Sequence, residues 1–109
     1  MKLIEELLEE AGFVKDRTYK EIRFLKVPDE NFAVWFESKQ ASGSDLEIRL
    51  INHFYRIEIY SQKAEMPEQN ALEKALNSCG IEWEAEEKNW IYDLQKFMVA
   101  YNFDYMEKI

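Results

Sequence analysis

Residues 45–60 read DLEIRLINHFYRIEIY, and apolar side chains alternate with charged ones along most of this stretch. A period of two is typical of β-strands with one buried face. We predict two strands here, residues 45–51 and 53–60, with a tight turn beside His53. The side chains expected to face inward are Leu46, Ile48, Leu50, Tyr55, Ile57 and Ile59.

The preceding segment continues the same pattern. YKEIRFLKV (19–27) and NFAVWFESK (31–39) flank the proline-led sequence PDEN, which suits a turn. QASGS (40–44) resembles a flexible loop leading into residues 45–51. Because the connections are short, we predict a four-stranded antiparallel meander.

Helical periodicity is present on both sides of this sheet. Residues 3–11 have a 3.6-residue apolar repeat that Gly12 ends, and a second helix begins at Pro67 and ends at Gly80. Residues 81–85 alternate and are a candidate fifth strand, and a third helix is predicted from Asn89 onward. The fold class predicted for residues 1–109 is a single α+β domain, with the meander flanked by one N-terminal and two C-terminal helices.

The net charge of −8 on 109 residues is unevenly distributed. Residues 1–10 carry −3, residues 61–109 carry −5, and residues 11–60 are neutral overall. A protein that binds nucleic acid directly needs a basic face, so the charge favours either a basic protein partner or simple solubility.

Location is inferred from three further features. No apolar run approaches the ~20 residues of a membrane helix, the first ten residues are acidic, and there is a single cysteine. We therefore expect a cytoplasmic protein without a membrane contact.

No residue pattern indicates catalysis. His53 is the only histidine, and three glycines are too few for a phosphate-binding loop. We expect no catalytic residues, no metal and no cofactor.

The stretch WEAEEKNW (83–90) is the first candidate site. If residues 81–86 are extended, Ile81, Trp83 and Ala85 face inward, and glutamates face outward about 6.6 Å apart. Such a row resembles the phosphates of a nucleic-acid strand. Together with the next glutamate, the candidate residues are Glu82, Glu84, Glu86 and Glu87. The alternative is that these charges protect a sheet edge and begin the following helix.

The first helix is the second candidate. Its polar face consists of Glu5, Glu6, Glu9 and Glu10, with no lysine between them. Repulsion between like charges four residues apart costs a few tenths of a kcal/mol per pair, roughly. This face is either a binding surface for a basic partner or a solvated surface.

The predicted final helix has two apolar stripes. One is the core face, and the second consists of Tyr92, Val99, Phe103 and Met106. A helix that is apolar on two sides is buried on two sides, either within the fold or by a partner or a second copy.

These observations favour a non-catalytic acidic binding protein. By analogy of size and charge, we expect a small inhibitor that occludes a basic, nucleic-acid-handling protein such as a nuclease, as toxin-immunity proteins and phage anti-defence proteins, including anti-CRISPR proteins, do. The alternative is a dimeric acidic chaperone or adaptor. The predicted order of helices and strands in this chain is similar to that of secretion chaperones, although its four consecutive strands depart from the chaperone order.

Overall fold

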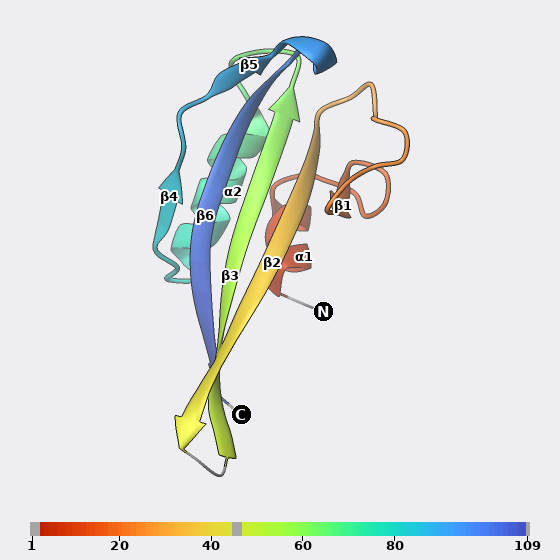
Figure 1. Cartoon of the computed structure of the whole chain (residues 1–109). Coiled ribbons are helices and arrows are strands. Elements are labelled where there is room, and N and C mark those ends of the chain that lie inside the picture. Colours follow the sequence, from red (N-terminus) through yellow and green to blue (C-terminus); the bar gives the residue numbers. More distant parts are fainter. Residues whose placement is uncertain (1–2, 45–46, 109) are drawn as a thin grey trace.

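The computed structural model describes residues 3–44 and 47–108 (Figure 1). The elements are, in order, α1 (Leu3–Glu10), β1 (Tyr19–Glu21), β2 (Phe32–Ser44), β3 (Glu47–Ser61), α2 (Pro67–Ser78), β4 (Trp83–Ala85), β5 (Asn89–Ile91), the 3₁₀ turn η1 (Tyr92–Leu94) and β6 (Lys96–Lys108).

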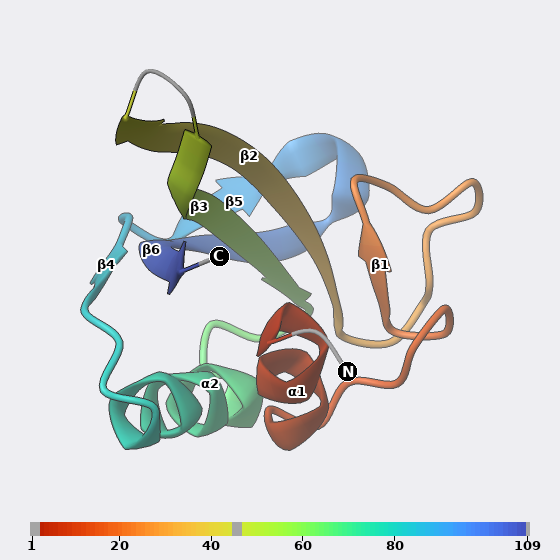
Figure 2. The same ribbon diagram turned by 90° about the horizontal axis from the view of Figure 1, so that it is seen from below.

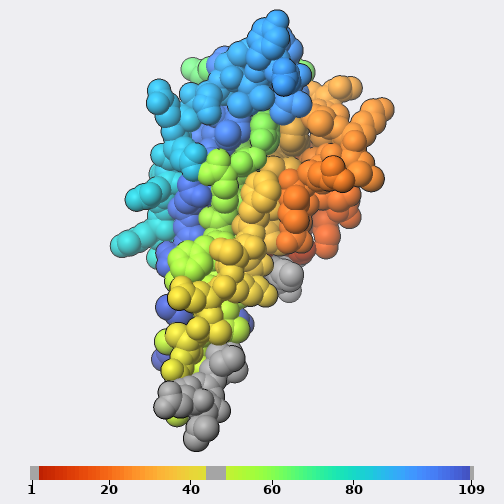
Figure 3. Space-filling model, in the orientation of Figure 1, coloured from red at the N-terminus to blue at the C-terminus, as the bar shows by residue number. Residues whose placement is uncertain are grey.

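The strands of the described residues form one six-stranded sheet in the order β1-β2-β3-β6-β4, and β5 also pairs with β6. All pairs are antiparallel except β1 with β2, which is parallel. Both helices cover one face of the sheet (Figure 2). No helix of the described residues covers the other face, where β2, β3 and β6 are visible side by side (Figure 3). We call these the helix face and the open face.

The core lies between the helices and the helix face. Alternate side chains of the three long strands point toward α1 and α2, and each fully buried Leu or Ile contributes about 1.5–3 kcal/mol. The buried strand residues include Ala33, Trp35, Ile57, Ile59, Val99 and Tyr101, and the helices contribute Ile4, Leu7, Leu8, Leu72 and Leu76.

The helices predicted at residues 3–11 and 67–79 are confirmed, and each ends at its glycine. Gly12 and Gly80 have φ angles of 105° and 69°, which L-residues rarely adopt. After α2, the N–H of Ile81 donates to the Leu76 carbonyl and that of Gly80 to the Asn77 carbonyl, both at 3.0 Å. This pair of bonds is a Schellman motif, so the glycine in the sequence was enough to predict where the helix ends.

The turn predicted beside His53 is wrong, because residues 47–61 form the single strand β3. Asn52 and His53 pair with Gln40 and Lys39 of β2 inside a continuous ladder. No Gly or Pro is present there to form a tight turn. Tyr55, Ile57 and Ile59 are buried on the helix face as predicted. Leu50 is an odd number of residues away from these three, so its side chain lies on the open face, contrary to the prediction. Leu46 and the side chain of Ile48 lie outside the described residues.

The third helix is also wrong, because residues 89–108 form β5, η1 and β6. The segment KFMVAYNFDYMEK satisfies both periods, since aromatic residues recur two and four positions apart. Aromatic and β-branched side chains favour strands, and Asn102 and Asp104 are weak helix formers. The free edge of β3 settles the choice, because β6 pairs along it from Ser61 to Leu50.

The predicted first strand is shorter than expected. Only residues 19–21 pair with β2, and they do so in parallel. Residues 22–31 form a loop in which Leu25 is 87% exposed. Residues 40–44, predicted as a loop, belong to β2, with a register shift between Ser42 and Gly43.

The four-stranded antiparallel meander with three helices is therefore replaced by a mixed six-stranded sheet with two α-helices in the described chain. The α+β class remains compatible with this arrangement. The candidate fifth strand at residues 81–85 is present as β4. Beyond the helices, β2, β3 and β6 continue as a projecting arm (Figure 1).

Candidate functional site

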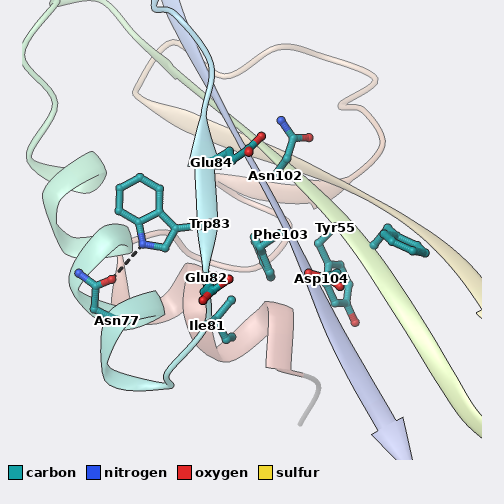
Figure 4. Close-up of a pocket in the computed structure, with 10 residues that line it drawn as sticks. Tyr55, Asn77, Ile81, Glu82, Trp83, Glu84, Asn102, Phe103 and Asp104 are labelled. Carbon is teal, nitrogen blue, oxygen red and sulfur yellow. Dashed lines mark hydrogen bonds between the residues drawn. The ribbon is translucent and has the colours of Figure 1, made fainter.

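The glutamates of the first candidate site lie on and beside the edge strand β4. Trp83, the strand's anchor, is half-buried against the core. Its ring contacts Tyr101 at a centroid distance of 5.4 Å, and its Nε1–H donates to Asn77 Oδ1 at 2.9 Å. Figure 4 shows this bond from β4 to α2. The indole therefore fixes the strand from which the acidic side chains project.

The outward positions predicted for the acids are confirmed, because all four side chains, Glu82, Glu84, Glu86 and Glu87, are exposed. The predicted inward positions hold in part. Ile81 and Trp83 pack against the core, whereas Ala85 is exposed because the strand lies at the edge of the sheet.

Glu86 differs from its neighbours because it has cationic and amide partners. It accepts hydrogen bonds from Arg56 and, at 2.7 Å, from the Asn102 amide. These two bonds, the one from Arg56 first, lower the pKa of Glu86. Arg56 also donates to Glu58 at 2.9 Å. Glu86 thus joins β4 to β3, and the unpaired charge in this row is reduced to three residues.

Glu82, Glu84 and Glu87 have no ion-pair partner within residues 3–44 and 47–108. Asp104 of β6 lies close to this group and was missed by the sequence analysis. A strand period over residues 96–108 would have placed it on the open face, two positions from Asn102, which pairs with Glu84.

Glu82, Glu84 and Asp104 line a groove of about 860 Å³ at the edge of the sheet. Its walls come from β4 and the end of α2 on one side and from β6 and β3 on the other (Figure 4). The lining residues are Phe54, Tyr55, Asn77, Ile81, Glu82, Trp83, Glu84, Asn102, Phe103 and Asp104. The lining combines apolar side chains with three carboxylates, so the groove suits a ligand that is both basic and apolar.

The glutamates of α1 belong to a different surface. Glu5 pairs with Lys15 at 3.1 Å, and Glu9 accepts a hydrogen bond from the Tyr19 hydroxyl at 2.6 Å. Glu6 and Glu10 are exposed. Figure 2 shows α2 between α1 and β4, so the structure does not bring the two predicted acidic groups together.

The predicted apolar stripe is not a surface. In a strand, Val99 and Phe103 point to the helix face, and both are buried. Tyr92 in η1 is 77% exposed and Met106 on the arm is 51% exposed. Ten residues of β6 separate Met106 from the start of the strand, about 33 Å at strand spacing. One small interface could not unite these four residues.

His53, which the sequence analysis placed beside a turn, belongs to a cluster of charged side chains. It lies within β3 on the helix face of the arm, between Glu37 of β2 and Glu107 of β6. Its Nδ1 is 2.5 Å from Glu37 Oε2, and its Nε2 is 2.9 Å from Glu107 Oε1. The bond to Glu107 and then that to Glu37 raise the pKa of His53. The imidazole ring therefore joins three strands.

No group of three or more His, Cys, Asp or Glu residues in the part of the chain that the structure describes is arranged to hold a metal ion. Neither helix in residues 3–44 and 47–108 has the length and apolar character needed to cross a bilayer.

Comparison with protein-family models and with curated proteins found no match.

Proposed function

We propose that this chain is a non-catalytic acidic binding protein, a small cytoplasmic inhibitor that occludes a basic, nucleic-acid-handling protein. Toxin-immunity proteins and phage anti-defence proteins, including anti-CRISPR proteins, are inhibitors of this kind. The observation that carries the proposal is the row of three carboxylates on and beside β4, Glu82, Glu84 and Glu87, which have no cationic partner within residues 3–44 and 47–108.

The arrangement of this row supports recognition rather than edge protection alone. A protective charge needs no fixed position, yet Trp83 holds β4 against Tyr101 and Asn77, and Arg56 holds its continuation through Glu86. Glu82 and Glu84 lie at strand spacing on either side of Trp83, and Glu87 adds a third carboxylate three residues further along the chain. A basic nucleic-acid-binding surface is complementary to such a row and is attracted to it at long range.

The alternative is a dimeric chaperone or adaptor, and the exposed apolar side chains favour it. Trp90, Tyr92, Tyr105 and Met106 are all more than two fifths exposed. They lie on η1, β5 and the end of β6, so a chaperone surface would have to be discontinuous. Sedimentation of the purified chain distinguishes the two functions, because the inhibitor needs no dimer.

A charge-reversal pair tests the proposal. The variant Glu82→Lys with Glu84→Lys is compared with Glu6→Lys with Glu10→Lys, which changes the net charge equally but on α1. Immobilised chains are exposed to host lysate, and the captured proteins are identified. We expect wild type and the α1 variant to retain basic nucleic-acid-binding proteins that added DNA competes away, and the β4 variant to lose them.

Two outcomes would contradict the proposal. Equal capture by the β4 variant would show that the row is only a solvated edge. Loss of capture in both variants would show that net charge, not this surface, is responsible. The salt dependence of capture is a further check, because an interaction between exposed charges weakens as the Debye length falls from ~10 Å at 0.1 M to ~3 Å at 1 M salt.

A further inference from the structure

One edge of β6 is open along its last residues. β4 pairs with β6 only from Tyr101 to Phe103, whereas β3 pairs with the other edge as far as Lys108. Within residues 3–44 and 47–108, no strand pairs with the outer edge of β6 after Phe103. An open strand edge is a template for pairing with another chain.

The direction of the backbone groups on this edge follows from one hydrogen bond. The N–H of Glu86 donates to the carbonyl of Ala100 at 2.8 Å, so the peptide groups of Ala100 point toward the β4 side. Backbone direction alternates along a strand, and Asn102, Asp104 and Met106 therefore point to the same side. The N–H and C=O groups of Asp104 and Met106 face the open edge.

The groove described above lies at the point where β4 leaves β6. It is lined from both faces of the sheet, with Phe103 and Tyr55 from the helix face and Asp104 and Glu84 from the open face (Figure 4). A chain placed there would continue the line of β4 along the arm. Among the described residues, Asp104 has a single polar partner, the Asn52 amide at 3.3 Å.

The side chains beside this edge define the chemistry of the missing strand. On the open face, the residue opposite Asp104 would lie about 4.5–5.5 Å from it, between their Cβ atoms. On the helix face, the next residue would meet Tyr105, whose ring is 43% exposed. At residues 104–108 the open face carries Asp104, Met106 and Lys108, and the helix face carries Tyr105 and Glu107, so a basic side chain fits opposite Asp104 and an apolar one opposite Tyr105.

We propose that an extended segment of the partner, with alternating basic and apolar residues, binds by adding a strand to the edge of β6 at residues 104–108. The main-chain bonds to Asp104 and Met106 supply affinity, and Glu82, Glu84 and Asp104 select basic side chains. This inference rests on the proposed function and names the binding mode of the same surface.

Designed peptides test the mode without the natural partner. The probes are the capped peptides KVKVKVK and EVEVEVE, titrated into the full ¹⁵N-labelled chain. We expect KVKVKVK to shift the amide signals of Asp104 and Met106 and to slow their hydrogen exchange, and we expect this binding to weaken with salt. EVEVEVE should cause neither change. Shifts confined to α1, or equal binding of both peptides, would overturn the inference.

A pair of variants isolates the backbone contribution. Met106→Pro removes the outward N–H without breaking a bond to β3, since proline is tolerated on an open edge. Met106→Ala removes the side chain and keeps the N–H. We expect KVKVKVK to bind Met106→Ala as it binds wild type and to bind Met106→Pro at least tenfold more weakly. Equal binding by the two variants would exclude strand addition.

Capture of the natural partner by these variants tests the strand-addition inference separately from the proposed function. If Glu82→Lys with Glu84→Lys abolishes capture and Met106→Pro does not, the acidic surface binds the partner without strand addition, and only the inference fails. If neither variant changes capture, both fail. Loss of capture in both variants, with capture retained by Met106→Ala, supports both.

Discussion

Trp83 has two contacts that fix the position of the edge strand β4. Its ring packs on Tyr101, and its indole N–H reaches Asn77 of α2. Both contacts lie on the helix face, while Glu82 and Glu84 project from the other side. One residue thus connects the core to the candidate binding surface.

Trp83→Ala should lower the free energy of unfolding by about 2–3 kcal/mol, less than the ~3–5 kcal/mol of a fully buried tryptophan, because the side chain is half-buried. Trp83→Phe keeps an aromatic ring and loses the hydrogen bond, so its cost should be about 1 kcal/mol. Urea unfolding monitored by circular dichroism measures both values. A loss below about 0.5 kcal/mol for Trp83→Ala would show that β4 is not anchored there.

His53 gives the arm a pH dependence of stability. Its pKa is raised by Glu107 and Glu37, so the folded state holds the proton more tightly than the unfolded chain does. This contribution is complete below the unfolded value of about 6.5 and is lost as the pH rises through the raised folded value. Tyr55 and Tyr105 flank the imidazole ring. Burial, and secondly the charge of Glu37, raises the pKa of Tyr55 to about 12. The Tyr55 hydroxyl therefore does not titrate in the same pH range as His53.

Wild type should therefore be more stable at pH 6 than at pH 8. His53→Gln should be less stable than wild type at pH 6 and should show a smaller difference between the two pH values. Urea unfolding at both pH values, combined with NMR titration of the imidazole, measures the effect. An imidazole that titrates below its ordinary pKa, or a wild type that gains stability toward pH 8, would contradict this account.

At the scale of elements, β6 is the strand that holds the sheet together. It pairs with β3 along its whole inner edge and with β4 and β5 on its outer edge. Its alternate residues Val99, Tyr101 and Phe103 are buried against the helices. A helix in its place would have left β3 at the edge of the sheet.

The same substitution at two positions of β6 distinguishes a strand from a helix. Phe103 is 6% exposed and Met106 is 51% exposed, whereas in a helix the two residues would share one face. Phe103→Glu buries an unpaired charge and should abolish cooperative unfolding. Met106→Glu should change stability by no more than about 0.5 kcal/mol. Similar losses for both variants in circular dichroism melts would argue for the helix.

For the whole molecule, the long strand pairings determine how the chain folds. Ser61 pairs with Phe97 and Leu50 with Lys108, so segments 36 to 58 residues apart in sequence must meet before β6 is in place. The entropy of closing such loops is lost before the contacts form. Folding therefore depends on non-local contacts even though α1 and α2 are local elements.

Refolding should accordingly take about milliseconds to seconds, as in other domains rich in non-local strand pairs. The three tryptophans provide a fluorescence signal for stopped-flow measurement. Phe103→Ala, in the last strand of the chain, is compared with Leu76→Ala in α2 to ask which region forms first. Complete refolding in microseconds would contradict the pairing of β3 with β6.

Local patterns in the sequence determined the parts of this protein that depend on neighbouring residues. The apolar repeats of α1 and α2, the glycines that end them, the alternation at residues 81–85 and the exposure of its glutamates all follow from spacing and from the conformational freedom of Gly12 and Gly80. These interactions span only a few residues, so no knowledge of the rest of the chain is needed.

Only the tertiary structure decided the features that depend on pairing between distant segments. Residues 96–108 fit a helix or a strand equally well by period, and the free edge of β3 selects the strand. The partners of His53, the bond from Arg56 to Glu86, and the place of Asp104 beside the groove depend on the register of β6. Register is a property of two segments at once, because a shift of one residue turns every side chain to the opposite face.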